Sequence, residues 1–189
     1  MTQVELNILH WIQENLRTEL LDGVLRCISS LGDAGMFWIV LSLVLMCFRK
    51  TRRAGFAAAA ALLLMQISGN MVLKPVIERA RPCDIDQTVE LLIARPHGSS
   101  FPSGHTASSF AVVFALFYIR SFWWKWALGL AAPIAFSRMY LFVHYPTDII
   151  GGIALGLVCG WLGAKIGRRL HRKYIRYRKA KRRRARAAA

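Results

Sequence analysis

The sequence is poor in acidic residues. Aspartate and glutamate together number 10 against 26 lysines and arginines, which gives a formal net charge of +16. Yet 55% of the 189 residues are hydrophobic, and a soluble domain rarely combines this composition with so large a charge. Long apolar runs in one part of the chain and basic residues in another would reconcile the two. The composition therefore favours a single-domain membrane protein.

Cysteine is also scarce, and its spacing excludes two kinds of site. Cys27, Cys47, Cys83 and Cys159 form no CxxC pair and no metal-ligand spacing. Cys47 and Cys159 fall inside apolar runs and are interpreted as small core residues. Cys27 and Cys83 would share one face of the membrane in the topology below, although nothing else favours a disulfide. The N-terminus lacks a basic region followed by an apolar core, so no cleavable signal peptide is expected.

Five apolar segments are candidates for membrane-spanning helices. They cover residues 34–48, 54–73, 103–119, 126–143 and 149–166. The second has twenty residues without a charge, which is long enough to cross a bilayer. In the fifth, Gly152, Gly156 and Gly160 recur at four-residue spacing, which permits close helix packing, although glycine is frequent in membrane helices anyway. The predicted fold class is an all-α polytopic membrane helical bundle of five spans.

The first thirty-one residues have a different pattern. Apolar residues recur at helical spacing among charged ones in the first half of this stretch, as in a helix lying on a membrane surface. Residues 20–31 are apolar but short and contain Asp22 and Arg26. We expect two amphipathic interfacial helices in residues 1–31, with a strained sixth span as the alternative. The catalytic core is then expected in residues 32–167 and a basic tail in residues 168–189.

Basic residues in the short loops predict the orientation. They follow the first span (Arg49, Lys50, Arg52, Arg53), the third (Arg120, Lys125) and the fifth, where 13 lie between Lys165 and Arg186 without an acid. This face, with the C-terminus, should be cytoplasmic. The tail is expected to contact anionic lipids, with a solvated, partly disordered end as the alternative. Nucleic acid is not an expected partner, because no module that reads it is present.

Two clusters on the opposite face suit an anion. Lys74 and Arg81 are seven residues apart, about two helical turns, so they can project from one helix face and grip an anion together; alternatively they are interfacial anchors. Ser103 and Gly104 mark a turn into a helix, whose N-terminal N–H groups favour an anion. Ser103 would cap this helix or donate to the anion, and His105 would stand beside it.

A third cluster supplies an oriented imidazole. Pro146 suits the first turn of a helix, so Asp148 should lie near a helix N-terminus with His144 in the preceding turn. The aspartate can accept a hydrogen bond from one ring nitrogen and leave the other as a nucleophile. Arg138 adds a cation within a span, where an unpaired charge is costly and usually functional.

Together the three clusters predict metal-free phosphoryl transfer through a phosphohistidine. Topology brings them to one membrane face, and they include no carboxylate cluster of the metal-binding kind, so neither a metal nor another cofactor is expected. Arg79, Arg95 and His97 lie in the same outer loop and are interpreted as solvated loop charges, with contact to a second phosphate or a head group as the alternative.

At these residues the chain resembles the type 2 phosphatidic acid phosphatase superfamily. Its motifs Lys-x6-Arg-Pro, Pro-Ser-Gly-His and Ser-Arg-x5-His-x3-Asp correspond to residues 74–82, 102–105 and 137–148. The resemblance implies a membrane lipid phosphatase with its site at the outer interface of a bacterial plasma membrane, facing the extracellular or periplasmic side. His144 would be the nucleophile, Asp148 its partner and His105 the general acid. The phosphate ligands would be Lys74, Arg81, Ser103, Gly104 and Arg138.

The substrate and oligomeric state remain open at this point. Undecaprenyl diphosphate is favoured because short members with an outward site often act on it, with phosphatidylglycerol phosphate and phosphatidic acid close behind. Alternatives are a lipid-linked phosphotransferase and a non-catalytic protein that binds anionic lipids. A vanadate-binding haloperoxidase is disfavoured, since those relatives are soluble.

Overall fold

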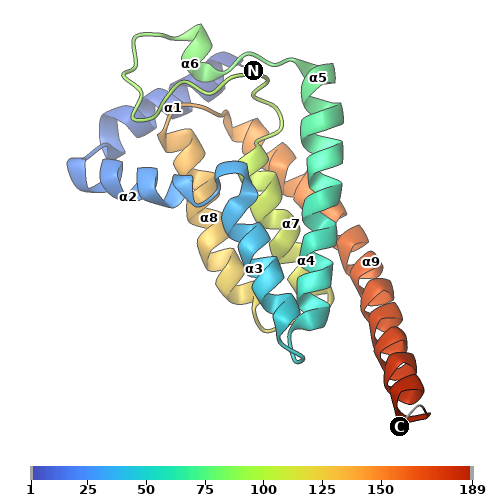
Figure 1. Ribbon diagram of the computed structural model, residues 1–189. Helices are drawn as coiled ribbons and strands as arrows, with labels where there is room; N and C mark the ends of the chain where they lie inside the picture. The colour runs from blue at the N-terminus through green and yellow to red at the C-terminus, as the bar shows by residue number, and fades with distance from the viewer. Residues whose placement is uncertain (1, 188–189) are drawn as a thin grey trace.

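The computed structural model describes residues 2–187, and every regular element within that range is a helix (Figure 1). The all-α fold class is therefore confirmed. The elements are α1 (Thr2–Leu16), α2 (Glu19–Ser30), the 3-10 turn η1 (Asp33–Gly35), α3 (Met36–Cys47), α4 (Arg52–Met65), the π-helical η2 (Gln66–Leu73), α5 (Lys74–Ile77), α6 (Pro82–Ile85), α7 (Gly104–Tyr118), α8 (Trp124–Tyr140) and α9 (Pro146–Ala187).

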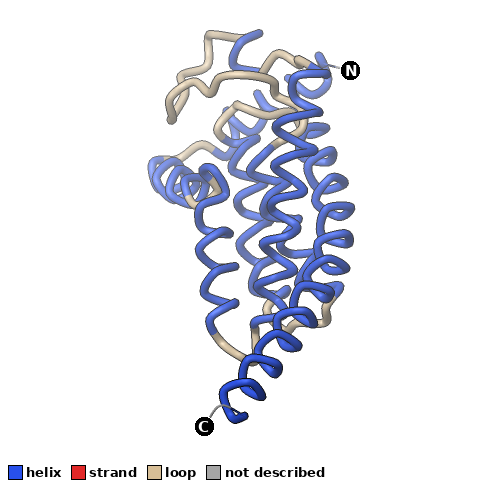
Figure 2. Tube along the Cα trace, turned by 45° about the vertical axis from the view of Figure 1, so that its right-hand side comes forward, coloured by secondary structure: helices blue, strands red, loops and turns tan. Residues whose placement is uncertain are grey.

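The long helices run side by side as a bundle, with loops gathered at its two ends (Figure 2). The central helix α7 packs against α4, α8 and α9, and α4 packs against α3 and α9. The core consists largely of alanine and aliphatic side chains from these helices, including the fully buried Ala57, Ala61, Ala111 and Ile134. Small residues let the helix axes approach closely.

Glycines on α9 allow its close contact with α7. A Cβ atom at Gly156 would lie 2.8 Å from the Phe110 Cβ, and one at Gly160 would lie 2.6 Å from the Phe114 Cβ. Both distances are too short for a side chain, so these positions require glycine unless the helices separate. The close packing predicted from the four-residue glycine spacing is confirmed.

Within residues 2–187, two helical segments are long and apolar enough to cross a membrane: Arg52–Ile85 and Pro146–Ala187. The bent pair Glu19–Ser30 and Asp33–Cys47 would be a third span, with a 43° bend at the break. Gly104–Tyr118 is apolar but shorter. Each of the five predicted segments contains a helix, but the number that cross the bilayer stays a prediction.

The N-terminal helix α1 packs on protein rather than presenting all its apolar side chains to a membrane. Leu6, Leu9 and Ile12 are buried against the chain that joins α8 to α9, around Phe142 and Val143. Periodicity predicted the amphipathic helix correctly, but it cannot distinguish a protein surface from a lipid surface as the partner of the stripe. This packing places α1 directly over the turn that carries His144.

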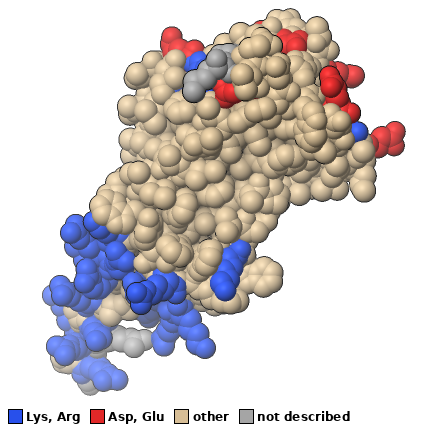
Figure 3. Space-filling model, turned by 180° about the vertical axis from the view of Figure 1, so that it is seen from behind, with Lys and Arg blue, Asp and Glu red and all other residues tan. Residues whose placement is uncertain are grey.

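The charges separate along the bundle. Lysines and arginines cluster at the end where α9 extends beyond the other helices, whereas acidic residues lie at the opposite end (Figure 3). The basic tail is helical as far as Ala187, so the alternative of a disordered end is wrong for the part of the tail that is described. All four cysteines are free; Cys83 and Cys159 are buried, whereas Cys27 and Cys47 are exposed, so the interpretation of Cys47 as a small core residue is wrong.

Candidate active site

His144 lies in a tight, buried turn between two helices. Helix α8 ends at Tyr140 and α9 begins at Pro146, as the proline predicted. Between them Phe142 has a φ of 59°, a left-handed conformation that is costly for an aromatic residue and common near functional sites. His144 is 2% exposed. The surrounding fold therefore holds the imidazole in place.

Asp148 lies against one side of this imidazole. Its Oδ2 lies 3.4 Å from the Nδ1 atom of His144, and that buried nitrogen forms no hydrogen bond that meets normal geometry. Such contacts are often long in unliganded enzymes and shorten when substrate binds. The predicted pairing of the two residues is present as a close contact.

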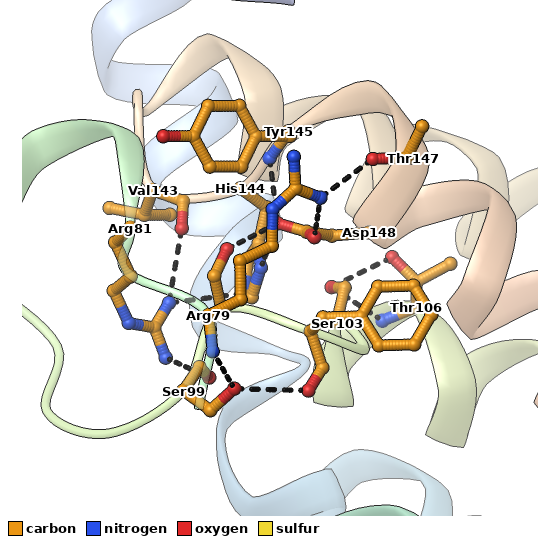
Figure 4. A network of polar contacts seen from close by, with 12 residues as sticks. Arg79, Arg81, Ser99, Ser103, Thr106, Val143, His144, Tyr145, Thr147 and Asp148 are labelled. Atoms are coloured by element: carbon orange, nitrogen blue, oxygen red, sulfur yellow. Dashed lines mark hydrogen bonds and ion pairs between the residues drawn. The ribbon is translucent and has the colours of Figure 1, made fainter. Parts of the chain in front are cut away.

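The carboxylate of Asp148 is itself held by several donors (Figure 4). The Tyr145 backbone N–H donates to Oδ2 at 2.8 Å, and the Ser100 hydroxyl donates to the same oxygen. The Arg79 guanidinium donates to Oδ1 at 2.6 Å. Asp148 is completely buried, so these bonds compensate for its desolvation and fix its orientation.

Arg79 is the residue that sequence reasoning missed. Besides Asp148, it donates to the Thr147 hydroxyl and to Oε2 of Glu5 on α1, both at 2.6 Å. The interpretation of Arg79 as a solvated loop charge is therefore wrong. A signal was present: Glu5 precedes Leu9 by four residues, which puts a carboxylate on the apolar stripe of α1, where a charge needs a buried partner.

Arg81 reaches the other side of His144. Its guanidinium donates to the carbonyls of Gly98 at 3.0 Å and Val143 at 3.1 Å, and its Nη1 lies 3.3 Å from the Nε2 atom of His144. A phosphoryl group attacked by Nε2 would therefore lie next to the Arg81 guanidinium.

The prediction that Lys74 and Arg81 share one helix face is wrong. Helix α5 ends at Ile77, Glu78 has a left-handed φ of 45°, and Arg81 is extended. Pro82 explains the break, because a residue that precedes proline is disfavoured in helical conformation. The two cations reach the site from separate segments.

Lys74 and His105 line one open cavity of about 350 Å³. A Cβ atom on Gly104 would lie 3.6 Å from the Lys74 Nζ, so the ammonium stands over the N-terminus of α7. The imidazole Nε2 of His105 contacts Oδ1 of Asp33 at 2.9 Å. The cavity thus combines a cation, a histidine and a helix N-terminus, which together suit an anion.

Ser103 caps α7. Its hydroxyl oxygen accepts hydrogen bonds from the backbone N–H and the hydroxyl of Thr106. Ser103 was predicted either to cap this helix or to donate to the anion, and the structure shows the capping role. Ser103 is completely buried, so a phosphate would have to approach this capping group to receive a hydrogen bond from it.

Arg138 is a nearly buried cation, 4% exposed, that donates to the hydroxyl of Ser29 on α2. Its Nε atom has no hydrogen-bond partner.

Burial lowers the pKa of His144 to about 3; Asp148 opposes this shift, and the charges of Arg81 and Arg138 reinforce it. His144 is therefore neutral at neutral pH, the form that a nucleophile requires.

Comparisons with known proteins identify the family of this chain. Residues 51–172 match the model of the PAP2 superfamily. The chain belongs to the PAP2 superfamily. An undecaprenyl-diphosphatase from Sulfolobus acidocaldarius is 32% identical over 150 residues, which cover 77% of this chain and 70% of that protein.

Two solved structures of this superfamily share the fold of the PAP2 chain. Aquifex aeolicus LpxE has a TM-score of 0.74 and 29% identity, covering 86% of this chain and 95% of that one. A transmembrane PAP2-type phosphatidylglycerolphosphate phosphatase from Bacillus subtilis has a TM-score of 0.71 and 27% identity, covering 89% and 86%. The chain is thus an integral membrane protein. The match to the PAP2 model contains all three clusters, whereas Glu5 lies before it.

Proposed function

We propose that this protein hydrolyses a membrane lipid phosphate or diphosphate through a phosphohistidine at His144. The observation that carries the proposal is the buried imidazole that lies between the Asp148 carboxylate and the Arg81 guanidinium. This geometry leaves Nε2 beside a cation that can neutralise a phosphoryl oxygen. Membership of the PAP2 superfamily and the lipid phosphatases among its relatives support it.

In the first step, Nε2 of His144 attacks phosphorus and the bond from phosphorus to the leaving oxygen breaks. Lys74, Arg81 and Arg138, with the Ser103 hydroxyl and the backbone N–H of Gly104, neutralise charge on the transferring oxygens. His105 gives its proton to the departing oxygen. Asp148 stabilises the positive charge that develops on the His144 ring.

In the second step, water replaces the histidine. His105, now neutral, takes a proton from the water molecule as its oxygen attacks phosphorus. The bond between phosphorus and Nε2 breaks, inorganic phosphate leaves, and both histidines return to their starting protonation states. The residues of this chain thus account for every proton, and no metal ion or cofactor takes part in the scheme.

An apolar groove beside the cavity suits the lipid tail. The groove has a volume of about 480 Å³ between α3 and α4 and is lined by apolar residues that include Ile39, Leu43, Leu62 and Leu63. It shares Gln66 and five other residues with the wall of the polar cavity that holds Lys74. A lipid could therefore keep its tail among the helices while its phosphate reaches His105.

We further propose five spans in a catalytic core of residues 32–167, in a bacterial plasma membrane. The positive tail, residues 168–189, would lie in the cytoplasm and the site on the extracellular or periplasmic side. The charge separation of Figure 3 supports this orientation, because the end rich in lysine and arginine is normally cytoplasmic.

A lipid panel tests the proposed function. We expect detergent-solubilised protein to release phosphate from undecaprenyl diphosphate with a kcat/KM roughly tenfold above that for phosphatidylglycerol phosphate or phosphatidic acid. EDTA should leave the rates unchanged, because the proposed charge stabilisation comes from Lys74, Arg81 and Arg138. No release from any of the lipids would contradict the function. A different order among them would contradict only the substrate.

Replacing Glu5 with glutamine tests whether α1 supports the site. The hydrogen bonds from Thr147 and Arg79 keep the pKa of Glu5 below its usual value, although burial alone would raise it. The stability that Glu5 contributes is therefore present above pH 4.5, the ordinary glutamate pKa, and is lost as the pH falls through the lowered pKa. At pH 7 the variant should lose about 2 kcal/mol, a decrease in melting temperature of roughly 4–8 °C.

The pH dependence separates this effect from a general loss of packing. The difference in melting temperature between wild type and Glu5→Gln should close in acid, because Glu5 is then protonated in both states of the wild type. The variant kcat should fall about tenfold with KM unchanged, because Glu5 acts through Arg79 on Asp148. Glu14→Gln, an exposed change on the same helix, is the control. A pH-independent difference, or an unchanged kcat, would contradict the proposed support.

A further inference from the structure

A second basic cavity lies far along α9 from the candidate active site. It has a volume of about 240 Å³ and is lined by Arg49, Arg52, His171, Ile175, Arg178 and Lys179. Its residues come from the α3–α4 loop, the first residue of α4 and the extension of α9, so two distant stretches of sequence supply them. None of the proposed catalytic steps uses this cavity.

The cations of this cavity have no acidic partner. Residues 34–77 and 149–189 contain no aspartate or glutamate. Within the described part of the chain, none of the six lining residues takes part in an ion pair. Like charges gathered in one hollow repel one another unless an anion lies between them, so the cavity has the electrostatics of an anion site.

Two of the arginines that line the cavity are held in place by contacts with other parts of the protein. Arg52 donates to the carbonyls of Met46 at 2.8 Å and Cys47 at 3.1 Å, at the C-terminal end of α3. The guanidinium carbons of Arg52 and Arg178 lie 5.0 Å and 5.9 Å from the centre of the same Tyr174 ring. Hydrogen bonds and cation–π contacts therefore hold two of the cations in position before any ligand binds.

The depth of the cavity indicates where its anion comes from. Arg52 lies two residues before the uncharged run 54–73, and His171 follows the apolar part of α9. The cavity therefore stands where a membrane-embedded bundle meets the layer of lipid head groups. Basic pockets next to spanning helices at this depth bind anionic head groups.

We propose that this cavity binds the phosphate head group of an anionic phospholipid of the surrounding membrane, as a site separate from the catalytic one. Arg49, Arg178 and Lys179 contact the phosphate, while Arg52 forms part of the wall and is held in place by the Tyr174 ring. The site would anchor the start of α4 to the extension of α9. It does not depend on the phosphatase chemistry, so either proposal can fail without the other.

Two matched triple variants of the full chain test the site. R49Q/R178Q/K179Q removes three charges from the cavity, and R169Q/K173Q/R176Q removes three exposed charges elsewhere on α9. Both leave Arg52 and the catalytic residues unchanged. Native mass spectrometry of detergent-solubilised protein measures retention of phosphatidylglycerol and phosphatidylcholine, and thermal melting checks that each variant is folded.

The cavity variant should bind phosphatidylglycerol about tenfold more weakly than wild type, and the control variant should stay within about twofold. Phosphatidylcholine should bind weakly to all three proteins, and millimolar inorganic phosphate should not displace phosphatidylglycerol. An equal loss of phosphatidylglycerol binding in the two variants would overturn the proposal, since the binding would then depend on the overall charge of the tail. Equal binding of both lipids, or displacement by inorganic phosphate, would overturn it as well.

Discussion

Replacing His144 with alanine should reduce phosphate release by about four orders of magnitude or more, because the variant loses the atom that attacks phosphorus. The loss should appear in kcat, with substrate binding largely preserved, since Lys74, Arg81 and Arg138 remain. Initial rates with the best lipid of the panel measure it. Enzyme concentrations must be high enough to detect a small residual rate.

Two controls make this result interpretable: a check that the variant is folded, and the replacement of a second histidine outside the site. His144 is buried, so its replacement could disturb folding. The melting temperature and elution profile of the His144→Ala protein should therefore be compared with those of the wild type. His97→Ala removes an exposed imidazole from the outer loop and should leave turnover unchanged. A folded His144→Ala protein with near wild-type activity would rule out the scheme.

The second large effect is expected at His105. Without a general acid, His105→Ala should slow transfer from an alkyl phosphate by roughly two to four orders of magnitude. Nitrophenyl phosphate should lose far less, because its leaving group departs without a proton. The first turnover, followed by rapid mixing, reports the formation of the phosphoenzyme separately from its hydrolysis.

The structure adds a reason to expect this leaving-group dependence. His105 lines the cavity with Lys74, and the Asp33 carboxylate contacts the His105 Nε2 atom at 2.9 Å, which holds the ring against this cavity. The aspartate in this role was not predicted from the sequence. An equal loss for the alkyl and nitrophenyl substrates would mean that His105 positions the phosphate instead of protonating the leaving group.

Local chemistry made much of the site predictable. Pro146 and the cap residue Ser103 predicted the starts of α9 and α7, and the spacing of His144 and Asp148 across a helix start predicted their contact. Glycine spacing on α9 indicated that a neighbouring helix could approach closely, although it did not say which one. These features depend on residues near one another in sequence, so propensity and capping rules suffice for them.

The errors came from contacts between distant residues. The link from Glu5 through Arg79 to Asp148 joins the first helix to the last, and no local pattern says which cation a buried carboxylate will contact. The helix expected to join Lys74 to Arg81 was drawn from spacing alone, although Pro82 already disfavoured it. The apolar stripe of α1 was correct as a stripe, and its buried residues pack on protein, while the position of α1 at the membrane interface stays a prediction.

Trapping the phosphoenzyme tests the central claim most directly. The protein would be mixed with a lipid radiolabelled at the phosphate to be transferred, denatured in alkaline detergent within the first turnover, digested and sequenced. Phosphohistidine survives alkali and is lost in acid. The account predicts an acid-labile label on the peptide that contains His144, and no label in His144→Ala. An acid-stable label, or one on any other residue, would contradict it.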